Sequence, residues 1–89
     1  MKKIYYKKFG GSVKRGGEDV LKIPKGERVW VQYFDSKSNL AFVLTSKEAS
    51  RDFYFLYESA KDGLHRLGKA HSPMELEEKY RVADQLKNP

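Results

Sequence analysis

Residues 27 to 34 read ERVWVQYF, and this stretch decides the fold class. Its side chains alternate along the chain, so a β-strand would place Val29, Val31 and Tyr33 on one face and Trp30 on the other. β-Branched and aromatic residues are also the types that strands favour. The pattern therefore predicts a strand with one buried face.

Other stretches carry strand signals of the same kind, either alternation or a dense run of β-favouring residues. They are residues 2–9, 19–23 and 40–45. Residues 10–17, GGSVKRGG, contain two glycine pairs and are predicted to form a mobile loop, because glycine gives the backbone wide conformational freedom.

Residues 46 to 62 fit two structures. As a helix, they would begin with a capping box and stop at Gly63. As a hairpin, the bulky run 53–57 would pair with 64–69 through the turn pair Asp62-Gly63. We favour the hairpin, because five consecutive residues of strong β preference are poor helix formers.

The end of the chain is predicted to be helical over residues 73–87. Ser72 stands at the N-cap, Pro73 follows at the first helical position, and Glu75 completes a capping box. Apolar residues then recur at helical spacing, which predicts one buried stripe. Its members are Met74, Leu76, Tyr80, Ala83 and Leu86.

These elements predict one small domain over residues 1–89. The fold class is mainly β, or small α+β: an antiparallel meander or small barrel of five to six strands with one C-terminal α-helix. Its expected parts are a basic N-terminal strand and Gly-rich loop (1–17), a β core (19–70) and the C-terminal helix (73–87).

Composition excludes several kinds of chemistry. The 89 residues contain no Cys, so disulfides, Cys-ligated zinc and a thiol nucleophile are all excluded. The two histidines, His65 and His71, match no familiar metal-ligand spacing, and no serine lies in a nucleophile elbow. We therefore expect no catalytic residues, no metal, no cofactor and no enzymatic activity.

The chain also lacks the long apolar runs that membranes require. No window approaches the roughly 20 apolar residues that cross a bilayer. After the basic start Lys2-Lys3, only three apolar or aromatic residues precede the next lysines, which is too few for an export signal. We expect a cytoplasmic protein without a transmembrane segment.

The net excess of positive charge is confined to one part of the chain. The formal net charge is +6, and residues 1–17 hold six basic residues and no acidic one, whereas residues 18–89 hold twelve of each. Clustered Lys and Arg attract anionic partners and release counterions from phosphates. Lysines on an edge strand can equally serve to prevent aggregation between sheet edges.

The charge cluster is interleaved with aromatic rings, a combination that single-strand nucleic-acid binders use for base stacking. We therefore predict a small basic binding protein that contacts nucleic-acid phosphates, of DNA or RNA, through its N-terminal strand and Gly-rich loop. The predicted contact residues are Lys2, Lys3, Tyr5, Lys7, Lys8, Lys14, Arg15, Arg28 and Trp30. Tyr5 and Trp30 are the candidate stacking rings.

An alternative from another class is a protein-interaction module, either an adaptor or an inhibitor. In that case the edge strand at 2–9 would add to the sheet of an acidic partner protein, and Trp30 would anchor the contact.

Overall fold

The computed structural model describes the backbone of residues 2–9, 12–15, 19–37 and 39–87, and the side chains of residues 23–37 and 39–86. Its strands are β1 (Lys2–Phe9), β2 (Ser12–Arg15), β3 (Asp19–Lys22), β4 (Glu27–Phe34), β5 (Leu40–Lys47), β6 (Tyr54–Ala60) and β7 (Gly63–Ala70). Two short helices follow, α1 (Pro73–Lys79) and α2 (Val82–Lys87). The chain is therefore mainly β, as the alternation predicted.

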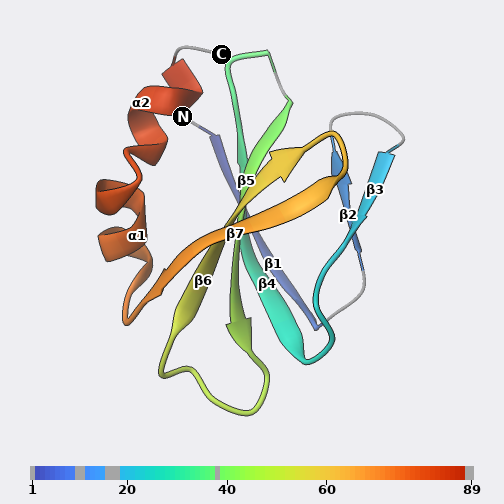
Figure 1. The fold of residues 1–89 in the computed structure, drawn as a ribbon, viewed down its shortest axis with the longest axis vertical. Coiled ribbons are helices and arrows are strands. Elements are labelled where there is room, and N and C mark those ends of the chain that lie inside the picture. The colour runs from blue at the N-terminus through green and yellow to red at the C-terminus, as the bar shows by residue number, and fades with distance from the viewer. Residues whose placement is uncertain (1, 10–11, 16–18, 38, 88–89) are drawn as a thin grey trace.

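Strands β4 to β7 form a four-stranded antiparallel meander, and β1 lies antiparallel beside β4 (Figure 1). Strands β2 and β3 pair with each other and form a separate ribbon, which we call the β2–β3 ribbon. Within the described residues no ladder joins β7 to β1, so the sheet is open. The barrel alternative is wrong, and a single array of five to six strands is not shown.

The open sheet has a layer on each side. Figure 1 shows α1 and α2 together on one side and the β2–β3 ribbon on the other. Two separate apolar clusters result, one on each face of the sheet. The helix-side core contains Val31, Tyr33, Phe42, Leu44, Leu56, Leu76, Val82 and Leu86. The ribbon-side core contains Ile23, Val29, Leu40, Val43, Phe55 and Tyr57. Both faces are buried in this way, so closure into a barrel is not needed for burial.

A bulge in β4 overturns part of the predicted alternation. The pairing with β5 shifts between Val29 and Val31, which leaves Trp30 as the extra residue. Val29 therefore belongs to the ribbon-side core, while Val31 and Tyr33 belong to the helix-side core. The prediction that all three share one face is wrong, because an extra residue reverses the faces beyond it.

The ambiguous stretch 46–62 contains no helix: its first two residues end β5, and Tyr54–Ala60 form β6, the first strand of the favoured hairpin. Strand β6 pairs with β7, and Ala60 faces Gly63 across the turn. Gly63 has φ of +134°, a backbone conformation that residues with a Cβ rarely adopt. The turn glycine therefore matches the geometry that the hairpin needs.

The expected mobile loop contains a strand. Ser12–Arg15 form β2, which pairs antiparallel with β3 in register from Ser12 opposite Lys22 to Arg15 opposite Asp19. The loop prediction is wrong for these four residues. They include no glycine, and β-branched Val13 favours the extended backbone. Glycines 10, 11, 16 and 17 lie outside the described residues.

The single C-terminal helix is divided in two. Ser72 caps α1 as predicted, but the helical path breaks at Tyr80 and Arg81, and Arg81 has φ of 52°. The break changes which residues face the sheet. Val82 is fully buried, whereas Met74, a member of the predicted stripe, is 66% exposed. On one uninterrupted helix Leu76 and Val82 would lie about 120° apart, and the break lets both point into the same core.

Candidate nucleic-acid interface

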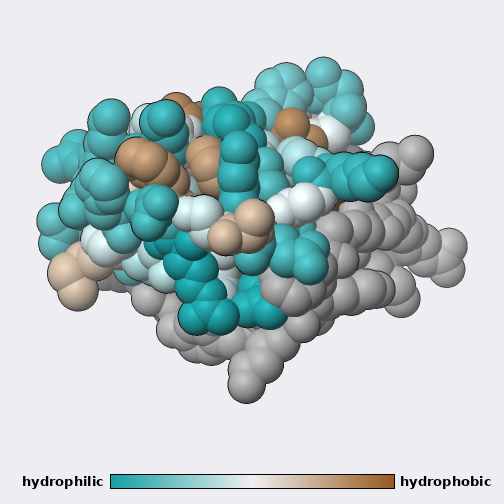
Figure 2. All heavy atoms as spheres, turned by 90° about the horizontal axis from the view of Figure 1, so that it is seen from below, coloured by the Kyte–Doolittle hydropathy of each residue, from teal (hydrophilic) through white to brown (hydrophobic). Residues whose placement is uncertain are grey.

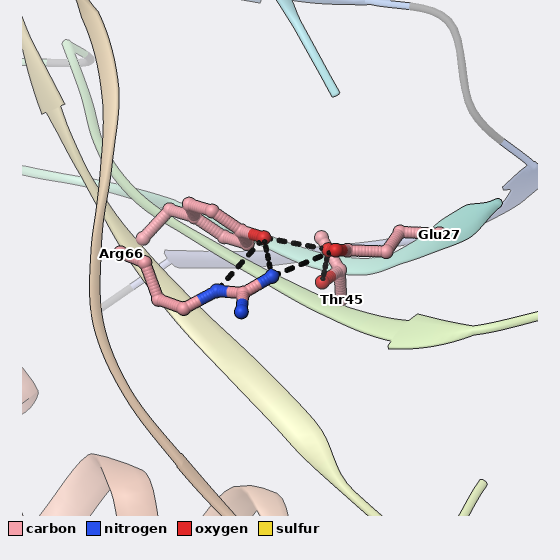
Figure 3. Close-up of polar contacts among 4 residues, drawn as sticks. Glu27, Thr45 and Arg66 are labelled. Atoms are coloured by element: carbon pink, nitrogen blue, oxygen red, sulfur yellow. Dashed lines mark hydrogen bonds and ion pairs between the residues drawn. The ribbon is translucent and has the colours of Figure 1, made fainter. Parts of the chain in front are cut away.

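A buried carboxylate joins four strands at one end of the sheet. Glu27, the first residue of β4, has a side chain only 5% exposed. Its carboxylate accepts hydrogen bonds from Thr45 Oγ1 at 2.6 Å, Tyr57 Oη at 2.7 Å and Arg66 Nη2 at 2.9 Å (Figure 3). Its donors come from β5, β6 and β7, so the cluster fixes these strands against β4. Burial of the charge is tolerable because it is paired and fully hydrogen-bonded.

The same contacts set the protonation states of the donors. Burial raises the pKa of Tyr57 to about 12; the hydrogen bond from Arg66 opposes the shift, and Glu27 reinforces it. Desolvation acts to lower the pKa of Arg66, but the contacts with Tyr57 and Glu27 outweigh it and raise that pKa. At neutral pH the cluster thus holds a neutral phenol and a charged guanidinium.

Beside this cluster the surface is hollowed into a groove of about 430 Å³ on the ribbon side. Strand β5, the 48–53 segment and strands β6 and β7 contribute to its walls. Its polar and charged lining consists of Lys47, Ser50, Asp52, Arg66 and Lys69. Three cations and one carboxylate face this space, so an anion would be favoured there.

Aromatic rings hold two of the groove cations in position. The Arg66 guanidinium lies 4.3 Å from the centre of the Phe55 ring, and Lys69 Nζ lies 4.7 Å from that of Phe53. His71 stacks on Phe53 with ring centres 4.5 Å apart. These rings are packed by side chains of the protein itself, so the groove offers charge and not an open stacking platform.

A second group of cations surrounds Trp30, on the helix side of the same end of the sheet. Its indole Nε1 donates a hydrogen bond to Ser46 Oγ, and its ring meets that of Tyr54 edge-on at 6.4 Å. The guanidinium carbons of Arg28 and Arg51 lie 5.2 and 5.0 Å from the centre of the indole ring. The structure therefore brings together the predicted pair Arg28 and Trp30 and adds Arg51.

We call this part of the molecule the basic end. It is where β4 and β6 begin and where β5 and β7 finish, and its cations are Arg28, Lys47, Arg51, Arg66 and Lys69. Acidic Glu27, Glu48 and Asp52 lie there as well, and Glu27 is neutralised by Arg66. Figure 2 looks onto this end: hydrophilic side chains dominate the described surface around a few small apolar patches.

The predicted N-terminal contact residues lie on two strands. Lys2, Lys3, Tyr5, Lys7 and Lys8 are in β1, and Lys14 and Arg15 are in β2. Their side chains fall outside the described residues, so their roles stay predictions.

The register places the N-terminal residues along the sheet. Lys8 pairs with Val29, in a row that continues through Thr45 and Phe55 to Lys69 at the basic end. Lys2 pairs with Phe34. It lies six residues before Lys8 in β1, so the two are roughly 20 Å apart along the strand. One end of β1 therefore lies at the basic end and the other does not.

The groove cations Lys47, Arg66 and Lys69 were missed by sequence reasoning, as was Arg51. Each is a single basic residue within or beside a strand, which usually indicates a solvated side chain. No local signal joins Arg66 to Glu27, because the two residues are 39 positions apart.

Comparisons with known protein families, curated proteins and solved structures find no match for this chain. In the described ranges, no helix has the length and apolar character to span a bilayer. Nor do three metal-binding side chains gather anywhere in that part of the chain. The expectation of a protein without metal stays a prediction.

Proposed function

We propose that this chain is a small, non-enzymatic protein that binds nucleic acid by its phosphates. Contact would run from the N-terminal strand β1 and the 10–17 segment onto the basic end. The cations would neutralise phosphates and release counterions, so binding would be strongly salt-dependent and only weakly sequence-specific. Trp30 would lie at the contact, flanked by Arg28 and Arg51.

One observation carries the proposal. The six uncompensated positive charges of residues 1–17 belong to strands whose register directs part of them to the basic end. Phe9 pairs with Arg28, and Lys8 shares a row with Lys69. This row crosses the whole sheet, so Lys8 and Lys69 lie on its two outermost strands, at the same end and roughly 19 Å apart. Cations distant in the sequence are thus brought to one end of the sheet, and clustered positive charge is the feature that polyanions recognise.

The test is a titration of labelled single-stranded and duplex oligonucleotides at several salt concentrations, with fluorescence anisotropy and Trp30 emission as readouts. We expect log affinity to fall linearly with log salt. Replacing Lys2, Lys3, Lys7 and Lys8 with Gln should reduce the magnitude of that slope by up to about 3.6, since each phosphate contact contributes roughly 0.7–0.9.

A matched control removes the same charge elsewhere. Lys37, Lys61, Lys79 and Arg81 are exposed and lie away from the basic end, so their replacement with Gln should lower the slope less. Equal slopes for the two variants would show that only overall charge matters. No binding at low salt would exclude the nucleic-acid function.

The alternative function is a protein-interaction module, and the edge position of β1 favours it. In the described sheet β1 pairs on one side with β4, and its other side is not paired with any described strand. Such an edge can accept a strand from a partner protein. Capture of an acidic protein that excess oligonucleotide fails to displace would favour this alternative over nucleic-acid binding.

A further inference from the structure

The contacts of Arg66 leave part of its guanidinium available. Its Nε and Nη2 donate to Tyr57 Oη at 3.2 and 2.7 Å, and Nη2 also donates to Glu27. Nη1 has no hydrogen-bond partner among the described residues, and Figure 3 shows it directed away from the cluster. The side chain is 47% exposed and lines the groove.

The two groove lysines are also available. Neither Lys47 nor Lys69 has a carboxylate within ion-pair distance in the described part of the chain. Lys69 is held over Phe53, and Lys47 ends β5 across the groove. Asp52, the acidic group in the lining, accepts a hydrogen bond from Ser50 Oγ at 2.8 Å.

From this arrangement we propose that the groove is a discrete phosphate-binding site centred on Arg66, with Lys47 and Lys69 as its other ligands. A guanidinium fixed on one edge presents its remaining N–H groups in a set direction, which suits the oxygens of a phosphate. Glu27 and Tyr57 act as positioning residues, because they order Arg66 before the ligand arrives and reduce the entropy lost on binding.

The groove volume, about 430 Å³, accommodates a phosphate together with an attached sugar. The phosphate would come from a nucleic-acid backbone or from a free or small-molecule phosphate. The first source deepens the proposed function and rests on it, whereas the second does not require it.

The experiment titrates the full chain with inorganic phosphate and follows the Arg66 Nε–H by ¹H–¹⁵N NMR, with sodium chloride at matched ionic strength as the reference. We expect a saturable shift with phosphate that chloride does not reproduce. An Arg66 signal that responds equally to both salts would overturn the site.

Single variants test which cations take part. Lys69→Ala and Lys47→Ala should each weaken phosphate binding by roughly 10-fold, the loss of one charge-assisted contact. Lys61→Ala removes the same charge from the exposed β6–β7 turn and should change the affinity less than 2-fold. If Lys61→Ala weakens binding as much as Lys69→Ala, the proposal is wrong, because only net charge would matter.

A second arm separates this site from the proposed function. An oligonucleotide without terminal phosphates is titrated into the wild type and into Lys69→Ala. If inorganic phosphate binds the groove but the oligonucleotide does not bind, the nucleic-acid function fails and the site stands. If the oligonucleotide binds with a steep salt slope but phosphate leaves Arg66 unshifted, the site fails and the function stands.

Discussion

Glu27 shows how one residue can stabilise several strands. Its carboxylate accepts bonds from Thr45, Tyr57 and Arg66, each on a different neighbouring strand. An amide in its place would keep one oxygen acceptor, turn the other into a donor that faces donors, and leave Arg66 without its counterion. The stability of this end of the sheet therefore depends on a single ionised group.

We predict that Glu27→Gln lowers the free energy of unfolding by about 2 kcal/mol or more, somewhat less than the roughly 3–5 kcal/mol for a fully buried pair, because Arg66 is half-exposed. Urea denaturation followed by Trp30 fluorescence measures the change. Glu58→Gln, an exposed glutamate in β6, is the control and should cost less than about 0.5 kcal/mol. Equal costs would contradict the assigned role.

Tyr57 predicts a pH dependence at the alkaline end. Its pKa is about 12 in the folded chain and about 10 when unfolded, so the folded state retains the proton more strongly. The corresponding stability is fully present below pH 10 and is lost as pH rises from about 10 to 12.

Unfolding free energies across pH 8 to 12 for the wild type and Tyr57→Phe provide the measurement. The difference between them should be constant up to about pH 10 and shift by up to roughly 3 kcal/mol above it. A difference that stays flat to pH 12 would mean that Tyr57 ionises as freely as in the unfolded chain.

At the scale of elements, the docking of α1 depends on a close approach to β7. A Cβ added to Gly68 would collide with the hydroxyl of Tyr80 and press on its ring, and this hydroxyl donates a hydrogen bond to the Leu67 carbonyl at 2.7 Å. Tyr80 is the C-cap of α1, where the helical path breaks before α2. The absence of a side chain at Gly68 thus lets the helix layer reach the sheet.

We therefore expect Gly68→Ala to destabilise the protein by about 1–3 kcal/mol, the usual cost of inserting a methyl group into packed space. Thermal unfolding in the wild-type and Tyr80→Phe backgrounds tests the cause. The cost should shrink when the hydroxyl is absent, which a double-mutant cycle would register as coupling. If the stability changes of the two substitutions simply add, the Tyr80 hydroxyl is not the source of the cost.

The bulge at Trp30 is the other element-scale feature with consequences for the site. It assigns Val29 to one core and Val31 to the other, and it puts Trp30 on the helix side beside Arg28. Alternation predicted the strand correctly, but it predicted the faces only up to the bulge. Nothing local in ERVWVQYF marks an extra residue, because the bulge depends on the pairing with β5.

At the scale of the whole molecule, most of the excess positive charge lies on an edge strand of the sheet. Strand β1 carries Lys2, Lys3, Lys7 and Lys8 and lies outermost in the described sheet. Lysines on such a strand would also discourage pairing between sheet edges of two molecules. Partner binding and protection of the edge are therefore separate roles that the same residues could fill.

Replacing these four lysines with Gln should promote self-association, because the edge would lose its repulsion while keeping its unpaired backbone groups. Sedimentation velocity at increasing protein concentration, with the Lys37/Lys61/Lys79/Arg81→Gln variant as control, measures this. If both variants stay monomeric, the lysines are not needed to protect the edge.

The groove too exists only at the scale of the whole molecule. Lys47, Arg66 and Lys69 come from two strands and reach one space because β5, β6 and β7 pair in a particular register. The N-terminal charge cluster, in contrast, is contiguous in the sequence and was visible there. This difference explains why reasoning from sequence identified the charged strand but missed Arg66.

The sequence by itself determined the β character of the chain, the capped start of α1 and the confinement of excess charge to residues 1–17. It favoured the β6–β7 hairpin over a helix but left both structures open. These features follow from local alternation, turn residues and caps, which act over a few positions. Only the tertiary structure decided that the sheet is open, that the last helix breaks, and that Glu27 holds Arg66 beside a cationic groove. Those outcomes depend on strand register and packing between distant residues, for which a local pattern contains no information.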